Sequence, residues 1–192
     1  MGRGPLAGPV YASAVVIASA DADLFLEGPL AGLTDSKKLT EAARERFCSI
    51  LRSLPGVRIG IGSASVAEID SMNILRATHL AMRRAVLDLG DPQLDHILVD
   101  GLPVKGLPAP STAIVKGDAQ SLLIAAASVV AKVTRDHLMA ELDARHPGYG
   151  FASNKGYGTA EHLAALRRLG VSSVHRRSFA PVADILAPKL NL

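Results

Sequence analysis

Residues 97–142 read ILVDGLPVKGLPAPSTAIVKGDAQSLLIAAASVVAKVTRDHLMAEL, and this stretch decides the fold. Two short apolar segments, 97–99 and 112–115, predict strands because they are apolar and bounded by Gly and Pro. The first strand ends at Asp100, and the second ends shortly before Asp118. The strongest helix signal in the chain follows directly. Two strands and a long helix in succession favour an α/β fold.

This helix is predicted over residues 121–142, and its two halves differ. The first half is apolar nearly all round, which indicates burial on several sides. The second half carries charged side chains that we expect to reach solvent: Arg135, Asp136, Glu141 and Asp143.

Outside this stretch, strand and helix patterns alternate along the chain. The apolar patterns predict strands at 10–17 and 57–64, and helices at 41–54, 66–71, 73–89, 159–169 and 181–186. Three helix starts are marked by good N-cap residues, Thr40, Ser65 and Thr159. The inward face of the 73–89 helix is predicted to carry Leu75, Leu80, Met82, Val86 and Leu89. The order and direction of strand pairing stay open.

Composition limits the class of protein. The chain has 192 residues, of which 48% are hydrophobic and 20% charged, so it can bury a core and is neither disordered nor low in complexity. A net charge of +3 permits a polyanionic partner without demanding one. The single cysteine, Cys48, excludes an internal disulfide and favours a cytoplasmic location. The longest near-apolar run, 122–133, is too short to cross a membrane.

Asp100 and Asp118 are the candidate catalytic residues, since each follows a predicted strand. Two carboxylates that approach each other repel, and a divalent cation removes that repulsion. Oxygen-only ligands suit Mg²⁺ or Mn²⁺. A purely structural interpretation stays open, because Asp-Gly is a common turn pair and an aspartate before a helix can simply cap it.

Other residues suggest binding of a phosphate backbone. Gly2, Arg3 and Gly4 could form a small phosphate-binding loop, although a flexible terminus has the same composition. Basic pairs could line such a surface or be solvated: Lys37-Lys38, Arg167-Arg168 and Arg176-Arg177. Tyr149 and Tyr157 lie in glycine-rich loops, where a ring can stack on a nucleotide or anchor the loop in the core.

Eight segments, taken in order, resemble bacterial ribonuclease HII. They are residues 2–9 (GRGPLAGP), 35–39 (DSKKL), 99–101 (VDG), 116–118 (KGD), 124–132 (IAAASVVAK), 147–151 (PGYGF), 155–159 (KGYGT) and 175–179 (HRRSF). The ordered set spans residues 2 to about 182 and is specific, although each piece alone is not.

The resemblance implies a ribonuclease H-like mixed β-sheet flanked by helices, with a catalytic core at 1–145 and a small C-terminal helical extension at 146–192. It implies cleavage of RNA in RNA–DNA hybrids and at single ribonucleotides in duplex DNA, with two Mn²⁺ or Mg²⁺ ions. Asp100 and Asp118 match two of the family's four acidic ligands. The residues that the resemblance assigns to nucleic-acid binding are Gly2, Arg3, Gly4, Ser36, Lys37 and Tyr157.

The family's other two acids, an Asp-Glu pair, precede the Gly-Arg-Gly loop, and here only Met1 does. Asp21, Asp23 and Asp35 match no motif that would replace them. We therefore interpret the chain as a shortened working enzyme that lacks its first sheet strand, with a start codon assigned too late. We expect it to be inactive or strongly impaired. An upstream reading frame that encodes no Asp-Glu segment would overturn this interpretation.

Two other functions stay open at this point. One is a non-catalytic protein that binds RNA–DNA junctions, and the other is a ribonuclease H-like enzyme that acts on DNA alone. We expect a monomer without membrane contact. The tail, residues 187–192, shows no convincing motif for a replication-clamp partner.

Overall fold

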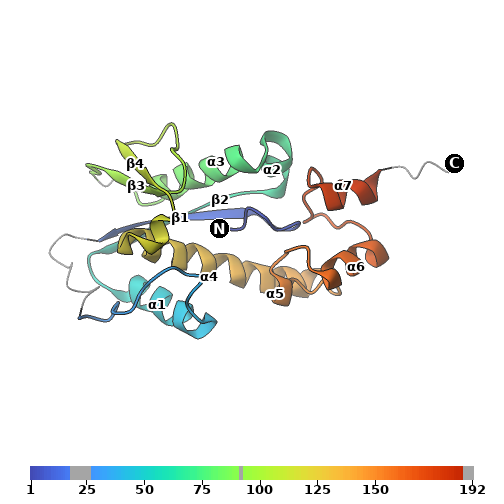
Figure 1. Ribbon diagram of the computed structural model, residues 1–192, viewed down its shortest axis with the longest axis horizontal. Helices are drawn as coiled ribbons and strands as arrows, with labels where there is room; N and C mark the ends of the chain where they lie inside the picture. The colour runs from blue at the N-terminus through green and yellow to red at the C-terminus, as the bar shows by residue number, and fades with distance from the viewer. Residues whose placement is uncertain (18–26, 91–92, 188–192) are drawn as a thin grey trace. The chain divides into compact units, whose positions relative to one another are not determined.

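The computed structural model describes residues 1–17, 27–90 and 93–187, so Asp21, Asp23 and residues 188–192 lie outside the described residues. The elements follow in the order β1 (Val10–Ile17), α1 (Glu41–Ser53), β2 (Val57–Ala64), α2 (Val66–Met72), α3 (Ile74–Leu87), β3 (Ile97–Asp100), β4 (Ser111–Ile114), η2 (Gly117–Ala119), α4 (Leu122–Arg145), α5 (Phe151–Asn154), α6 (Ala160–Leu169) and α7 (Ala180–Leu186) (Figure 1). The predicted α/β fold is confirmed.

The strands pair in two separate sets within the described residues. β1 is a neighbour of β2 in one two-stranded sheet, and β3 pairs with β4 in another. The β3–β4 pair is parallel, with Ile97 opposite Ser111 and Asp100 opposite Ile114. A parallel pair places the carboxyl ends of both strands at one edge, and Asp100 lies at that edge.

The chain packs as two compact units. Unit 1 comprises the described residues among Met1, Tyr11–Ser63 and His79–Val133, and unit 2 those among Gly2–Val10, Ala64–Thr78 and Thr134–Leu192. The predicted division into a catalytic core at 1–145 and a C-terminal helical extension at 146–192 stays a prediction. No described helix has the length and apolar character needed to cross a membrane.

Unit 1 has helices on both faces of the β1–β2 sheet (Figure 1). On one face, α1 and the first half of α4 form a core that includes Phe47, Leu51, Val129 and Val130, and β2 packs its partly buried Val57, Ile59 and Ile61 against this core. The alternate residues of β2 face α3. The strand therefore lies between two helical layers.

The glycines of β2 allow an unusually close approach to α3. A Cβ added at Gly60 would lie 2.0 Å from the carbonyl oxygen of Ala85, and one added at Gly62 would lie 2.1 Å from that of Ala81. The inward face of α3 is consequently lined by alanines. Ala77, Ala81 and Ala85 are at most 1% exposed.

This alanine face corrects part of the prediction for the helix. Val86 and Leu89 are buried as predicted, but Leu75 is 39% exposed, and Leu80 and Met82 are only partly buried. The prediction named the larger apolar side chains of the helix. The close approach of β2 instead leaves room only for small side chains on the face of α3 that contacts this strand.

Unit 2 has its own apolar core, built from the second half of α4, α6, α7 and the N-terminal loop. Leu6, Met139, Phe151, Leu166 and Val182 are among its buried residues. The prediction that the second half of α4 faces solvent is wrong for two residues, because Arg135 is 1% exposed and Asp136 is 6% exposed. Both therefore need polar partners inside the unit.

We expect Gly62→Ala to destabilise the chain strongly. Its Cβ would collide with the α3 backbone at Ala81 and Ala85, which cannot turn aside as a flexible side chain could. Overpacking of this kind costs about 3 kcal/mol. Urea unfolding measures the loss, with Ser63→Ala on the same strand as the control. An unfolding free energy equal to that of the control would show that the close approach is wrong.

Candidate active site

The ends of β3 and β4 bring Asp100 and Asp118 to the same edge of unit 1. Asp100 is the last residue of β3, and its Oδ1 accepts a hydrogen bond of 2.9 Å from the N–H of Gly117. Gly117 opens η2, the short turn between β4 and α4, and Asp118 follows it. Asp100 is exposed and Asp118 is 6% exposed. Asp100 is thus hydrogen-bonded to the residue that directly precedes Asp118.

Little room is left for a side chain at Gly117. An added Cβ would lie 2.6 Å from Cδ1 of Ile124 and 3.5 Å from Oδ1 of Asp100. Lys116, just before it, has a positive φ of 55°, a conformation uncommon outside glycine. The Lys-Gly-Asp segment is therefore a tight turn that fixes Asp118 relative to Asp100.

A third part of the chain reaches this edge. The ammonium of Lys37 lies 3.3 Å from Oδ2 of Asp118 and 3.9 Å from Oδ1 of Asp35. Asp35 holds the lysine in place, since its Oδ1 also accepts a hydrogen bond of 2.9 Å from the N–H of Lys37. The Asp-Ser-Lys-Lys segment therefore supplies a cation to the predicted acidic pair.

The charges at this edge act on one another. Burial alone would lower the pKa of Lys37, but its hydrogen bond with Asp118 and the charges of Asp118, Asp35 and Asp100 outweigh burial and raise the pKa. The pKa of Asp35 is lowered, chiefly by the hydrogen bond from the Lys37 backbone. The ammonium of Lys37 and the carboxylate of Asp35 thus stabilise each other in their charged forms.

The donor set has the chemistry that a hard divalent cation prefers. Asp100 and Asp118 offer carboxylate oxygens only, and the Lys37 ammonium shows that positive charge is stabilised beside them. Over residues 1–17, 27–90 and 93–187, however, no three His, Cys, Asp or Glu side chains are arranged so that they could hold a metal ion. The described acids therefore fit part of a metal site.

Ser36 lies beside Lys37 but does not face solvent. Its side chain is fully buried, and its hydroxyl is 2.9 Å from that of Ser128 on α4. Its carbonyl accepts a hydrogen bond of 3.1 Å from Arg44. In this structure Ser36 fixes the turn that carries Lys37, and its predicted contact with nucleic acid stays a prediction.

The second group of predicted residues lies in unit 2. Arg3 and Gly4 are exposed, and Gly2 is buried. Tyr157 is 45% exposed, and a Cβ added at Gly4 would lie 3.5 Å from its Cε1. The structure therefore brings the Gly-Arg-Gly loop and Tyr157 together, with the ring lying against a residue that has no side chain.

Tyr149, in contrast, anchors its loop. It is 8% exposed, its hydroxyl donates a hydrogen bond of 2.8 Å to the carbonyl of Gly170, and its ring stacks on Phe151 at 5.3 Å between centroids. Of the two interpretations left open by the sequence, the core anchor holds for Tyr149.

Two buried histidines support the carbonyl of Tyr157. The N–H of Ser172 donates to Nδ1 of His175 at 3.1 Å, so the proton of His175 is on Nε2. That Nε2 lies 3.1 Å from Nε2 of His162, whose Nδ1 is 2.8 Å from the carbonyl oxygen of Tyr157. This chain of hydrogen bonds, for which no sequence pattern was a signal, fixes the neutral form of both rings.

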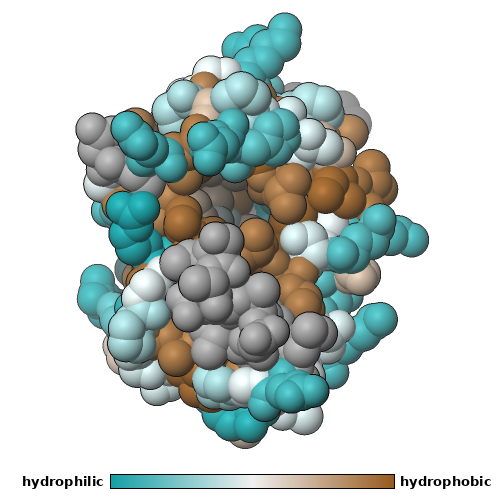
Figure 2. Space-filling model, turned by 90° about the vertical axis from the view of Figure 1, so that its left-hand side faces the viewer, coloured by the Kyte–Doolittle hydropathy of each residue, from teal (hydrophilic) through white to brown (hydrophobic). Residues whose placement is uncertain are grey.

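Large apolar side chains are exposed around the acidic edge of unit 1. They flank the acids in sequence and are Leu98, Leu102, Val115, Leu122 and Leu123. Apolar side chains are also visible among charged ones on the face that Figure 2 shows. A sheet that lacks its first strand would leave apolar side chains uncovered, and the loss of that strand stays a prediction.

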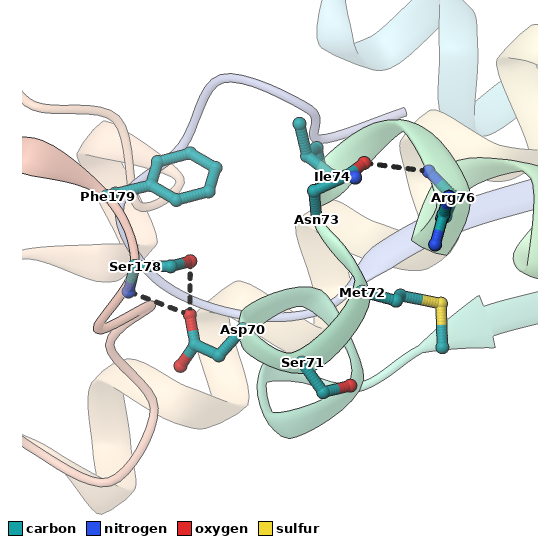
Figure 3. Close-up of a pocket in the computed structure, with 8 residues that line it drawn as sticks. All are labelled: Asp70, Ser71, Met72, Asn73, Ile74, Arg76, Ser178 and Phe179. Atoms are coloured by element: carbon teal, nitrogen blue, oxygen red, sulfur yellow. Dashed lines mark hydrogen bonds between the residues drawn. The ribbon is translucent and has the colours of Figure 1, made fainter.

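A pocket of about 470 Å³ lies within unit 2, between the α2–α3 turn and the segment before α7 (Figure 3). Asp70 accepts hydrogen bonds from the N–H and the hydroxyl of Ser178, and Asn73 accepts one from the N–H of Arg76. The pocket contains none of the predicted site residues, and these side chains mainly join α2 to the C-terminal segment.

Comparison with known proteins supports the resemblance. The model of the family described as Ribonuclease HII matches residues 1–182. Ribonuclease HII of Rhodospirillum rubrum is 58% identical over 187 residues, which cover 97% of this chain and 84% of that protein. Ribonuclease HII of Desulfitobacterium hafniense is 53% identical, with coverage of 96% and 68%. The crystal structure of ribonuclease H2 from Pyrococcus horikoshii is similar at a TM-score of 0.72 and 26% identity, with coverage of 96% and 93%.

We expect His175 to make stability fall in acid. Burial, followed by the charge of His162, lowers its pKa from 6.5 to about 4. Between these two pH values the unfolded chain takes up a proton that the folded chain does not, so stability is lost as the pH falls. The loss is on the order of 3 kcal/mol.

Urea unfolding at pH 7 and pH 4 measures this effect. Because carboxylates also titrate in this range, the comparison is between the unmodified chain and His175→Gln, which cannot be protonated. The unmodified chain should lose more stability between the two pH values than the variant does. Equal losses would show that His175 is protonated in the folded chain.

Proposed function

The chain belongs to the ribonuclease HII family, and on that premise we propose that it cuts the RNA strand of RNA–DNA hybrids and single ribonucleotides in duplex DNA. The family consists of ribonuclease H endonucleases. The observation that carries the proposal is the placement of Asp100 and Asp118 at one strand edge, joined through the N–H of Gly117.

Asp100 and Asp118 would hold a divalent cation, Mg²⁺ or Mn²⁺, as part of a two-metal site. A bound cation supplies the positive charge that offsets negative charge developing on the scissile phosphate and the leaving oxygen. The chain's own groups prepare this place. Gly117 fixes the Asp100 carboxylate, the turn at Lys116 fixes Asp118, and Lys37 balances their charge until a cation takes its place.

The Gly-Arg-Gly loop and Tyr157 would recognise the RNA–DNA junction. Arg3 is exposed and can pair with a phosphate, and the half-exposed ring of Tyr157 can stack on a sugar or base. A ribose 2′-hydroxyl is the group that distinguishes RNA from DNA at such a place. Lys37, with its side chain 74% exposed, would add a backbone contact.

A second candidate function is binding of the junction without cutting. It is favoured by one observation, that no three metal-ligating side chains come together among the described residues. With two carboxylates where the family uses four, we expect residues 1–192 to cut weakly or not at all. We further propose a monomer in the cytoplasm, where the buried thiol of Cys48 stays reduced.

We expect residual cutting to depend on the acidic pair. The substrate is a duplex with one embedded ribonucleotide, and the ion is Mn²⁺. Asp118→Asn should lower the cleavage rate by at least roughly ten-fold, because it removes a charged metal ligand, while the dissociation constant for the duplex stays within about two-fold. Asp95→Asn, the same change at an exposed residue just before β3, is the control.

Each outcome of this assay distinguishes the candidates. Cutting above a metal-free control excludes the pure binding function, and binding without cutting supports it for residues 1–192. Undiminished cutting by Asp118→Asn would remove Asp118 from the site. Equal rates on an all-DNA duplex would instead favour a nuclease that acts on DNA alone.

A further inference from the structure

We propose that two buried arginines, Arg176 and Arg135, are positioning residues for junction recognition, because they hold the carbonyls of the N-terminal loop inward and so turn the N–H groups of Arg3 and Gly4 outward. The inference rests on the proposed function of that loop. The inference assigns a role to Arg135, which was predicted to face solvent, and to Arg176, which was predicted to be solvated or part of a basic surface.

Arg176 is fully buried beneath the loop. Its guanidinium donates hydrogen bonds to the carbonyls of Gly2 at 2.7 Å, Arg3 at 3.0 Å, Gly8 at 2.8 Å and Pro9 at 3.3 Å. A single side chain thus joins both ends of the segment 2–9. Its own N–H also donates to the carbonyl of Leu6 at 2.8 Å.

Arg135 completes the support from α4. It donates to the carbonyls of Ala7 at 3.1 Å, Pro9 at 3.1 Å and Lys155 at 2.9 Å. The carbonyl of Lys155 belongs to the segment that leads to Tyr157, so Arg135 ties the two parts of the proposed recognition surface together. No lysine could do this, because an ammonium lacks the planar fork of donors.

The first glycine of the loop is explained by this packing. Gly2 has a φ of 83°, which favours glycine, and an added Cβ would lie 2.2 Å from Nε of Arg135. The loop therefore lies directly on the guanidinium. A side chain at this position would lift the loop away from the donors that orient it.

The inward carbonyls determine what the loop presents to solvent. In a planar trans peptide the C=O and the following N–H point in opposite directions. Because the carbonyls of Gly2 and Arg3 point toward Arg176, the N–H groups of Arg3 and Gly4 point away from it. Two successive outward N–H groups form a concave site for an anionic oxygen, which in this protein would be a phosphodiester oxygen at the ribonucleotide.

The buried charges favour the same ligand. Desolvation, and then the nearby charge of Arg135, lower the pKa of Arg176 to about 9, and Asp70 partly offsets this. Two guanidinium groups beneath the loop would attract a phosphate above it.

The test measures how well the chain distinguishes ribonucleotides. Dissociation constants are measured, with EDTA present, for a duplex with one embedded ribonucleotide and for the same duplex in DNA only. The proteins are residues 1–192 unmodified, Arg176→Lys, Arg135→Lys and, as the control, Arg84→Lys. Arg84 also donates to a carbonyl, that of Ser63 at 2.8 Å, but both residues belong to unit 1. Arg3→Ala tests the loop itself.

We expect Arg176→Lys and Arg135→Lys to lower the preference for the ribonucleotide duplex at least ten-fold, while affinity for the DNA duplex changes much less. Arg84→Lys should leave both constants unchanged. Should Arg3→Ala lose the preference while folded Arg176→Lys keeps it, the positioning inference is overturned and the proposed function stands. An unmodified chain without any preference overturns both.

Amide hydrogen exchange on the unmodified chain provides a check that needs no stable variant. The N–H groups of Arg3 and Gly4 should exchange fast in the free chain and at least ten-fold more slowly when the ribonucleotide duplex is bound. Slow exchange in the free chain would contradict the outward orientation. Equal protection by the all-DNA duplex would contradict recognition of the ribonucleotide by these N–H groups.

Discussion

The N-terminal loop has little regular secondary structure, so its buried carbonyls need hydrogen-bond donors from other parts of the chain. The structure of unit 2 depends on these donors. Buried backbone groups without partners are costly, and water does not reach this place. Arg176 and Arg135 supply seven hydrogen bonds to carbonyls of the loop and of Lys155. Burial of two charged groups is itself unfavourable, so neither the loop nor the guanidinium groups would be stable in this place alone.

Local signals in the sequence were enough to place most of the helices and strands. Thr40, Ser65 and Thr159 each accept the capping hydrogen bond expected of them, because a cap involves residues only three apart. The role of Arg176 could not be found in this way, since its partner Gly2 is 174 residues distant. The charge of Arg176 indicated contact with solvent. Only the folded structure shows that backbone carbonyls take the place of water as its hydrogen-bond partners. The face of α3 was mispredicted for a similar reason, since Gly60 and Gly62 act from another element.

The candidate site was predictable to the extent that it follows from strand ends. Asp100 is the last residue of β3, and Asp118 lies in η2, the turn that follows the parallel neighbour β4, where an α/β sheet commonly places reactive groups. From the residues alone Lys37 belonged to one of three basic pairs, and only the resemblance distinguished it from the others. Its contact with Asp118 spans 81 residues of sequence. Ser36 shows the limit of transfer by motif. Its neighbour Lys37 contacts Asp118, but the hydroxyl of Ser36 itself is buried and forms a hydrogen bond with that of Ser128.

The two sites hold their cations in different ways, and the difference fits their proposed tasks. The guanidinium groups in unit 2 are buried, and each is held by at least three acceptors, so nothing in solution can exchange with them. The Lys37 ammonium is on a flexible and largely exposed side chain, and its strongest link is one contact of 3.3 Å. A carboxylate pair balanced by such a lysine can release it when a cation of higher charge arrives, at little cost. A recognition loop needs the opposite property. If its peptide groups had to rotate before their N–H groups could bind the substrate, the free energy of that rearrangement would reduce the affinity. Fixed charge therefore suits the loop that would read the substrate, and exchangeable charge suits the acids that would cut it.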